Sequence, residues 1–142
     1  MIESIQNIYY TMYKELKAYL IENSKYDMTV DTREPNKKKF PIVIVSELSD
    51  DSIYTTLKYT DEIYYMDLEI NTYAIQNGNI PNKTIAEETT NLIEQFFKDN
   101  YRVSIRTTRD VPNLDTNVYR NLTTVSFKIE TKYKDKLVIS PR

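Results

Sequence analysis

Two segments of the chain carry apolar residues at helical spacing. In residues 2–22 the stripe consists of Ile5, Ile8, Met12, Leu16, Tyr19 and Leu20. In residues 85–99 it consists of Ile85, Thr89, Leu92, Ile93, Phe96 and Phe97. Positions three and four residues apart lie on one face of an α-helix. The pattern therefore predicts two amphipathic helices, with polar residues on their other faces.

The second helix has recognisable signals at both ends. Thr84-Ile85-Ala86-Glu87 follows Pro81 and has the form of a capping box. In such a box the Thr hydroxyl and the Glu carboxylate bond backbone N–H groups at the helix start. Asn100 marks the expected end, and Gly78, the single glycine, predicts a turn in Gln76-Asn77-Gly78-Asn79.

Alternation of apolar and polar residues predicts strands. Mostly apolar residues alternate with mostly polar ones through residues 63–74, 101–106 and 121–131. A period of two places one set of side chains on a buried face and the other on a polar face. The continuous apolar run Phe40–Val45 suits a strand buried on both faces, with Pro41 near its start or on an edge.

Polar segments separate these predicted strands. Residues 24–39 are polar and predict a loop or a loosely ordered arm. Ser49-Asp50-Asp51-Ser52 is expected to end the first strand, and a separate strand is expected at Tyr54–Tyr59. Thr60-Asp61-Glu62 would join that strand to residues 63–74 as an antiparallel hairpin.

The predicted elements define a fold class. Their order is α-β-β-β-α-β-β in one domain, residues 1–142. Short connections between strands favour an α+β fold, a mostly antiparallel sheet of about five strands covered on one face by two helices. The predicted core consists of Ile8, Met12, Leu16, Leu92, Ile93 and Phe96 packed on Val43, Val45, Leu68, Ile70, Val103, Val125 and Phe127.

Composition excludes several chemistries. The chain has 0 Cys and 0 His, so it has no thiolate nucleophile, zinc–thiolate site or imidazole base. A single glycine excludes glycine-rich phosphate-binding loops. We therefore expect no catalytic residues, no metal and no cofactor, and a protein that is not an enzyme.

Charge and hydropathy limit the partners. The net charge is -2, so no global positive field attracts nucleic acid. The longest apolar run, Phe40–Val45, is far shorter than the roughly 20 residues that span a bilayer. No targeting segment is recognisable. We expect a soluble protein without membrane or specific nucleic-acid partners.

Three pairs of carboxylates have catalytic and structural interpretations. Glu87 and Glu88 fit a helix cap and the helix dipole. Asp67 and Glu69 fit a solvated or interface-facing strand surface. The third pair, Asp110 and Asp115, shares a segment up to Asn117 that alternates acidic and amide side chains as a calcium loop does. It lacks the glycine and distal glutamate of an EF-hand. A turn-rich connection is the better interpretation of this segment.

Tyrosine is unusually frequent, with 13 residues. Large contact area, few rotors and a polar end suit tyrosine to protein interfaces. General enrichment in Asn, Lys, Ile, Tyr and Thr is an equally good explanation. The tyrosines concerned lie on the first predicted helix and on the hairpin: Tyr9, Tyr10, Tyr13, Tyr19, Tyr54, Tyr59, Tyr64, Tyr65 and Tyr73.

Two long irregular segments are the expected partner-binding sites. They are Asp31–Lys39 and Arg109–Tyr119, both longer than the usual connections in compact domains. Their opposite charges would suit head-to-tail contact between subunits. The alternative is that both are mobile surface loops. The candidate interface residues are Arg33, Lys37, Lys38, Lys39, Arg109, Asp110, Asp115, Tyr119 and Arg120.

Several segments occur here in the order found in one protein family. They are Phe40-Pro-Ile-Val-Ile-Val45, Leu68-Glu-Ile-Asn-Thr-Tyr-Ala74, a helix ending in Phe96-Phe97, and Pro112-Asn-Leu-Asp-Thr-Asn-Val-Tyr-Arg120. The last run, which leads into the final strand, is the most specific. Over roughly residues 5 to 133 the chain resembles bacteriophage tail terminator proteins, also called tail-completion or minor tail proteins.

The resemblance implies a function as well as a fold. It implies an α+β domain that assembles into a hexameric ring on the head-proximal end of the tail tube. Such a ring stops tube polymerisation and provides the surface on which the filled head docks. The implied partners are other copies of the chain, the tail-tube protein and a head-tail connector or neck protein. The implied location is the tail of a virion or phage-tail-like particle, assembled in the cytoplasm of the bacterial host.

Two alternatives remain at this point. One is another phage head-tail joining or neck protein of similar size and composition. The other, from a different class, is a small binding module or enzyme of a bacterial host. Neighbouring genes would discriminate between them, because tail-tube and tape-measure genes favour the phage role and a metabolic operon favours the host role.

Overall fold

The computed structural model describes residues 2–33, 39–55, 62–132 and 136–141, and the side chains of residues 8–33, 39–47, 63–130 and 138–141. Helix α1 spans Ile2–Asn23, and strands β1, β2 and β3 follow at Thr29–Asp31, Ile42–Thr55 and Glu62–Ala74. Helix α2 spans Asn82–Asn100, and strands β4, β5 and β6 lie at Ser104–Thr108, Tyr119–Lys132 and Lys136–Pro141.

The six strands form one sheet in the order β1-β2-β3-β5-β4, with β6 also pairing with β5. Every pairing is antiparallel except that of β1 with β2. Strand β4 pairs with residues 122–126 of β5 and β6 pairs with residues 127–132. The two short strands therefore share one edge of β5, end to end.

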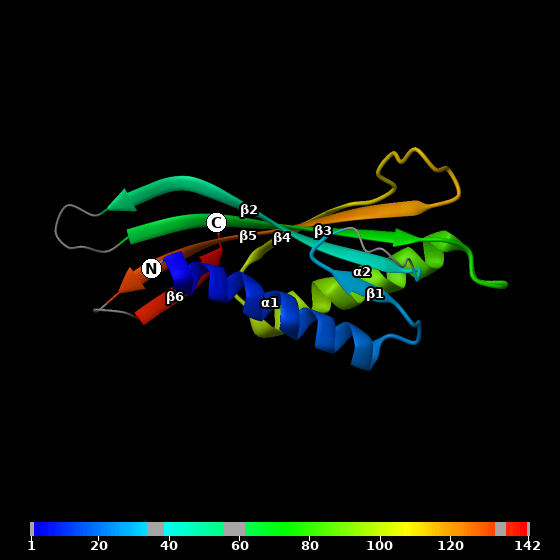
Figure 1. Cartoon of the computed structure of the whole chain (residues 1–142), viewed down its shortest axis with the longest axis horizontal. Helices are drawn as coiled ribbons and strands as arrows, with labels where there is room; N and C mark the ends of the chain where they lie inside the picture. Colours follow the sequence, from blue (N-terminus) through cyan, green and yellow to red (C-terminus); the bar gives the residue numbers. More distant parts are fainter. Residues whose placement is uncertain (1, 34–38, 56–61, 133–135, 142) are drawn as a thin grey trace.

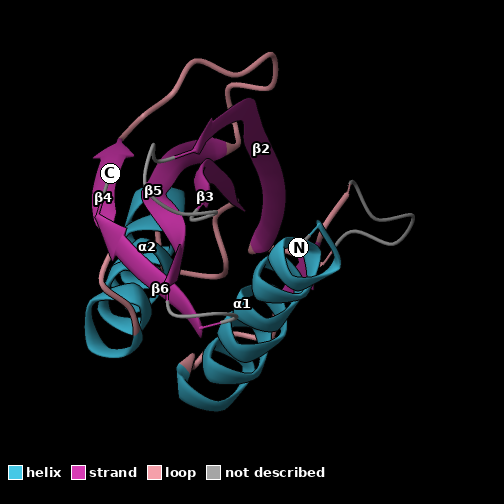
Figure 2. Ribbon diagram, turned by 90° about the vertical axis from the view of Figure 1, so that its left-hand side faces the viewer, coloured by secondary structure: helices cyan, strands magenta, loops and turns pink. Residues whose placement is uncertain are grey.

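Both helices lie on the same side of the sheet (Figures 1 and 2). The sheet twists above them, and in Figure 1 the loop between β4 and β5 rises from the opposite side. The predicted α+β class and the order α-β-β-β-α-β-β are confirmed, with β6 as an additional strand at the end.

Strand bounds differ from the predictions at β4, which starts at Ser104 and not at Tyr101, and in the first half of the sheet. Ser49-Asp50-Asp51-Ser52 does not end a strand, because β2 continues through it to Thr55. Ser49 pairs with Met66 and Ile53 with Tyr64, so β2 has more residues in this interval than β3. A bulge of this kind accommodates extra residues in one strand, while pairing continues on both sides of it. The predicted separate strand at Tyr54–Tyr59 is wrong for Tyr54 and Thr55, which belong to β2. The rest of that predicted strand lies outside the described residues.

The predicted arm contains a strand. Residues 29–31 form β1, whose Val30 is buried beside Val43 in the parallel ladder. The backbone N–H of Thr29 donates to the carbonyl of Pro41 at 3.0 Å. Pro41 itself precedes the first residue of β2, as its missing N–H requires.

The start of α2 also differs from the prediction. The helix begins at Asn82 after Pro81, and no side chain caps it. Thr84 is therefore an exposed residue inside the first turn, and the predicted capping box is wrong. The predicted turn is confirmed by a positive φ of 60° at Gly78, where the absence of Cβ removes the steric cost.

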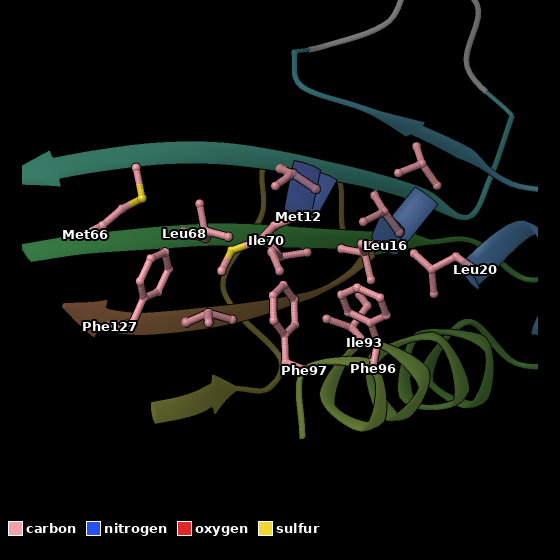
Figure 3. Packing of buried hydrophobic residues seen from close by; sticks show 14 of the residues in the cluster. Met12, Leu16, Leu20, Met66, Leu68, Ile70, Ile93, Phe96, Phe97 and Phe127 are labelled. Atoms are coloured by element: carbon pink, nitrogen blue, oxygen red, sulfur yellow. The ribbon is translucent and has the colours of Figure 1, made fainter. Parts of the chain in front are cut away.

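The core lies between the helices and the inner face of the sheet (Figure 3). Phe96 and Phe97 meet edge to face with ring centroids 5.0 Å apart, and Tyr19 of α1 contacts Phe96. Predicted core residues are buried except for Ile8, Leu92 and Val103, which are partly buried against the cluster. Leu20 and Phe97 of the predicted helix stripes are buried too, as are Met66 and Ile129 of the predicted strands and Val30 of β1.

Candidate partner-binding surfaces

The outer face of the sheet is polar. Along β5, the buried residues from Asn121 to Ile129 alternate with half-buried residues that point away from the helices. The ladder registers place the same alternation on β3 and β4. No helix of the described residues covers this outer face (Figure 2). Its side chains include Asp67, Glu69, Asn71, Tyr73, Ser104, Arg106, Arg120, Leu122, Thr124, Ser126, Lys128 and Glu130.

A shallow hollow of about 300 Å³ lies in this face. The register brings Ser126 of β5 opposite both Asp67 of β3 and Ser104 of β4. Small hydroxyl side chains thus lie between the carboxylate of Asp67 and the guanidinium of Arg106. The lining residues are Asp67, Ser104, Ile105, Arg106, Thr124 and Ser126. Asp67 and Glu69 thus lie on the outer face that the alternation predicted for them.

A network of hydrogen bonds and ion pairs around Arg109 binds the loop of residues 109–118 to α2. The Arg109 Nε donates to Glu87 Oε2 at 2.9 Å, and Nη2 donates to Glu94 Oε1 at 3.3 Å. The hydrogen bond to Glu87 is the main reason that the pKa of Arg109 is raised. Glu87 therefore binds this loop and does not cap its helix. A second carboxylate contact comes from Thr107, whose hydroxyl donates to Glu94 at 2.8 Å.

A buried amide continues this network under the loop. Asn121 is fully buried, and its Nδ2 donates to Thr90 Oγ1 at 3.0 Å. Its Oδ1 accepts from the backbone N–H of Asp110 at 3.2 Å, where the backbone has a positive φ of 55°. Asn and Asp adopt this left-handed conformation more readily than most residues. The position of the loop is thus fixed from the interior of the molecule.

The tip of the loop is built from turns. Asp115 Oδ1 accepts from the Asn117 N–H at 2.9 Å, and the Val118 N–H donates to the Asp115 carbonyl at 3.2 Å. The Asn82 side chain at the start of α2 donates to the Asn117 carbonyl at 3.1 Å. These bonds form the turn-rich connection that the sequence favoured. They leave Leu114 fully exposed at the tip.

Tyr119 and Arg120 follow the loop and point to opposite faces of the sheet. Tyr119 packs against Ala74, Ile85 and Ala86 on the helix side. Burial, and then the charges of nearby acidic groups, raise the pKa of Tyr119.

Arg120 belongs to the outer face. Its Nε donates to Asn71 Oδ1 at 2.9 Å, and its guanidinium lies over the Tyr73 ring at 5.6 Å from the centroid. Contacts with two neighbouring side chains hold this cation in one orientation on the polar face.

The remaining candidate residues lie near β1. Arg33 is exposed, and Lys39 Nζ pairs with Asp27 at 3.0 Å, with both side chains largely in solvent. Lys37 and Lys38 lie outside the described residues. Apart from Tyr119, which faces the helices, the described candidate residues therefore lie in three places: the arm beside β1, the loop of residues 109–118 and the outer face.

The tyrosines of α1 have different environments. Tyr9 donates its hydroxyl to the Val45 carbonyl at 3.0 Å, and Tyr13 donates to the Val30 carbonyl at 3.3 Å. Tyr19 contacts Phe96. Three of the four thus connect α1 to the sheet or to α2, whereas Tyr10 is 51% exposed. The side chains of Tyr54 and Tyr59 lie outside the described residues.

A groove between the end of α1 and α2 was not anticipated from the sequence. Its volume is about 480 Å³. Tyr26 donates its hydroxyl to Glu88 Oε2 at 2.8 Å, and Lys25 Nζ lies 3.2 Å from the same oxygen. Burial and this hydrogen bond raise the pKa of Tyr26. The lining residues are Asn23, Ser24, Lys25, Tyr26, Glu88, Asn91, Leu92 and Gln95.

Acidic side chains of the described residues do not form a group of three or more that could hold a metal ion. Within the same residues, neither helix is long and apolar enough to cross a membrane. The chain matches no protein-family model, and no curated protein is significantly similar to it.

Proposed function

We propose that this protein is a phage tail terminator, a structural virion protein that caps the head-proximal end of a tail tube as a ring. In this role it ends tube polymerisation and presents the surface on which the head docks. The ring is expected to contain six copies, as the resemblance to tail terminators implies.

The observation that carries the proposal is the polar outer face of a long-stranded sheet. Strands β2, β3 and β5 have 14, 13 and 14 residues, longer than the usual five or six. Their outer face offers carboxylates, cations and hydroxyls with partial exposure. Interfaces that form between preassembled parts are about as polar as the rest of a protein surface. Such a face suits docking to other virion parts.

The fastened loop supports the same proposal. The run Pro112–Arg120, on which the resemblance chiefly depends, forms the tip of the loop and the first residues of β5. Asn121 and Arg109 hold this segment against α2, so its exposed residues are presented in a fixed geometry. A preorganised loop binds a partner without the entropic cost of ordering it.

Deleting the gene from the phage or prophage that carries it tests the proposal. We expect heads to assemble normally while tail tubes have irregular length and carry no heads in negative-stain electron microscopy. Immunogold labelling of intact particles should place the protein at the junction of head and tail. Tails of normal length that join heads without the protein, or label at the distal tip, would refute the terminator role.

A point variant tests the outer face. Ser126→Lys adds a long cation to a half-exposed strand position between Asp67 and Ser104. We expect the variant to fold and to fail in complementing the deletion. Asp99→Lys, at an exposed position near the end of α2, is the control and should complement. Full complementation by Ser126→Lys would exclude the outer face as a docking surface.

A further inference from the structure

The exposed large apolar side chains of the described residues lie in two places. Tyr10 and Ile21 are 51% and 60% exposed on α1. Ile75 and Leu114 are exposed at the end of the sheet where β3 and the loop of residues 109–118 terminate. Single exposed apolar residues are common, so exposure alone does not define a contact site, and the charges beside these residues distinguish the two surfaces.

The first surface, the helix patch, consists of Tyr10, Lys14, Lys17 and Ile21. Spacings of four, three and four residues place them on one stripe, on the side of α1 away from buried Met12 and Leu16. Lys14 Nζ lies 4.5 Å from the centroid of the Tyr10 ring, and Lys17 lies over the ring of Tyr13. The patch is thus apolar and positively charged, with its lysines steadied by cation–π contact.

The second surface, the loop patch, consists of Ile75, Asp110, Leu114 and Asp115. Leu114 is fully exposed, and both aspartates are exposed. The cation of this loop, Arg109, is already engaged by two glutamates of α2. The loop patch is therefore apolar and negatively charged.

We propose that the helix patch of one copy docks on the loop patch of the next copy, head to tail. The two patches are both apolar at their centres and opposite in charge. Figure 1 places α1 below the sheet and the loop of residues 109–118 above it, so these surfaces face different neighbours. Contact between two different surfaces repeats from copy to copy, and it closes into a ring when the rotation permits.

This inference rests on the self-assembly part of the proposed function and assigns its surfaces. Docking would bury Leu114 and Ile21 without breaking contacts inside either copy, because both side chains are exposed in the single chain. The lysines and aspartates set the register of the contact. The outer face of the sheet stays available for the tube or the head.

Engineered cysteines test the contact in the purified full-length protein. The chain contains 0 Cys, so introduced thiols are unambiguous. Leu114→Cys and Ile21→Cys, made as separate variants and mixed under mild oxidation, should give a covalent dimer of one of each. A chain carrying both substitutions should give a ladder of covalent oligomers. Adding Lys14→Glu and Lys17→Glu to the Ile21→Cys variant should lower the dimer yield on the order of tenfold.

Leu114→Cys mixed with Lys98→Cys, which is exposed on α2, gives the background level of random cross-linking. A Leu114–Ile21 yield equal to that background would overturn the inference. Preferential Leu114–Leu114 cross-links would also overturn it, because they indicate a symmetric contact. The gene deletion described above scores tail length independently, so failure of the cross-link and failure of the terminator role are separate results.

Discussion

At the scale of single residues, one buried amide does most to position the loop of residues 109–118. Asn121 occupies a strand position that faces the core, where alternation alone would place an apolar side chain. Its donor and acceptor bond Thr90 and the Asp110 backbone, so the polar group is satisfied. Buried polar groups cost little when bonded and much when a partner is removed.

Asn121→Ala should therefore lower the free energy of unfolding by about 1–3 kcal/mol, because Thr90 and the Asp110 N–H lose their partner. The same variant should make the loop of residues 109–118 more susceptible to limited proteolysis. Asn113→Ala, at an exposed loop position, is the matched control and should stay within about 0.5 kcal/mol in urea denaturation. Equal stability of the two variants would contradict the role of Asn121.

Tyr101, which follows α2, connects the two helices. Its hydroxyl donates to Glu15 Oε2 at 2.6 Å. Burial, and then this hydrogen bond, raise the pKa of Tyr101 well above its ordinary value of 10.0. The folded state therefore holds the phenolic proton more tightly than the unfolded chain. The resulting stabilisation is fully present below pH 10 and is lost as pH rises above it.

Tyr101→Phe should remove this component. Urea denaturation should find the variant less stable than the original protein at about pH 8, with a smaller difference at about pH 11. Tyr10→Phe, whose ring is half exposed, serves as the comparison. A stability difference that is constant across this pH range would contradict the assignment.

At the scale of elements, packing of the amphipathic faces holds α1 and α2 against the sheet. Leu16 and Phe96 face each other across this layer in Figure 3, and they are 0% and 3% exposed. No side chain caps the start of α2. Burial of these stripes is therefore the main source of their stability.

Leu16→Ala should lower the free energy of unfolding by about 2–5 kcal/mol, the usual range for emptying a close-packed site. Ile21→Ala changes an exposed residue of the same helix and should have an effect within about 0.5 kcal/mol. Thermal or urea denaturation of both variants gives the comparison. A loss below about 0.5 kcal/mol for Leu16→Ala would contradict its place in the core.

At the scale of the whole molecule, the two sides of the sheet have different roles. The inner side builds the core with both helices, and the outer side stays polar. The helix patch and the loop patch lie on separate parts of this asymmetric molecule. Contact between these two different surfaces would repeat head to tail, as the proposed ring requires.

The sequence by itself determined the periodic elements. Helical spacing defined α1 and α2, and alternation of apolar and polar residues indicated β3 and β5, because burial of one face imposes the same period on residue type and on geometry. The predicted α+β class followed from the order of these elements. The turn at Gly78 was also predictable, since it depends on a local backbone preference.

Tertiary structure decided the features that depend on distant partners. Strand β2 continues through Ser49–Ser52 because it pairs with β3 on both sides of this segment, although these residues favour a turn. Glu87 bonds Arg109 instead of the backbone at the helix start, so the contact predicted from the local capping pattern was wrong. The helix patch was missed because its residues are ordinary in sequence. The helix patch lies on the side of α1 away from the core, and only the packing of the whole chain determines which side of the helix faces the core.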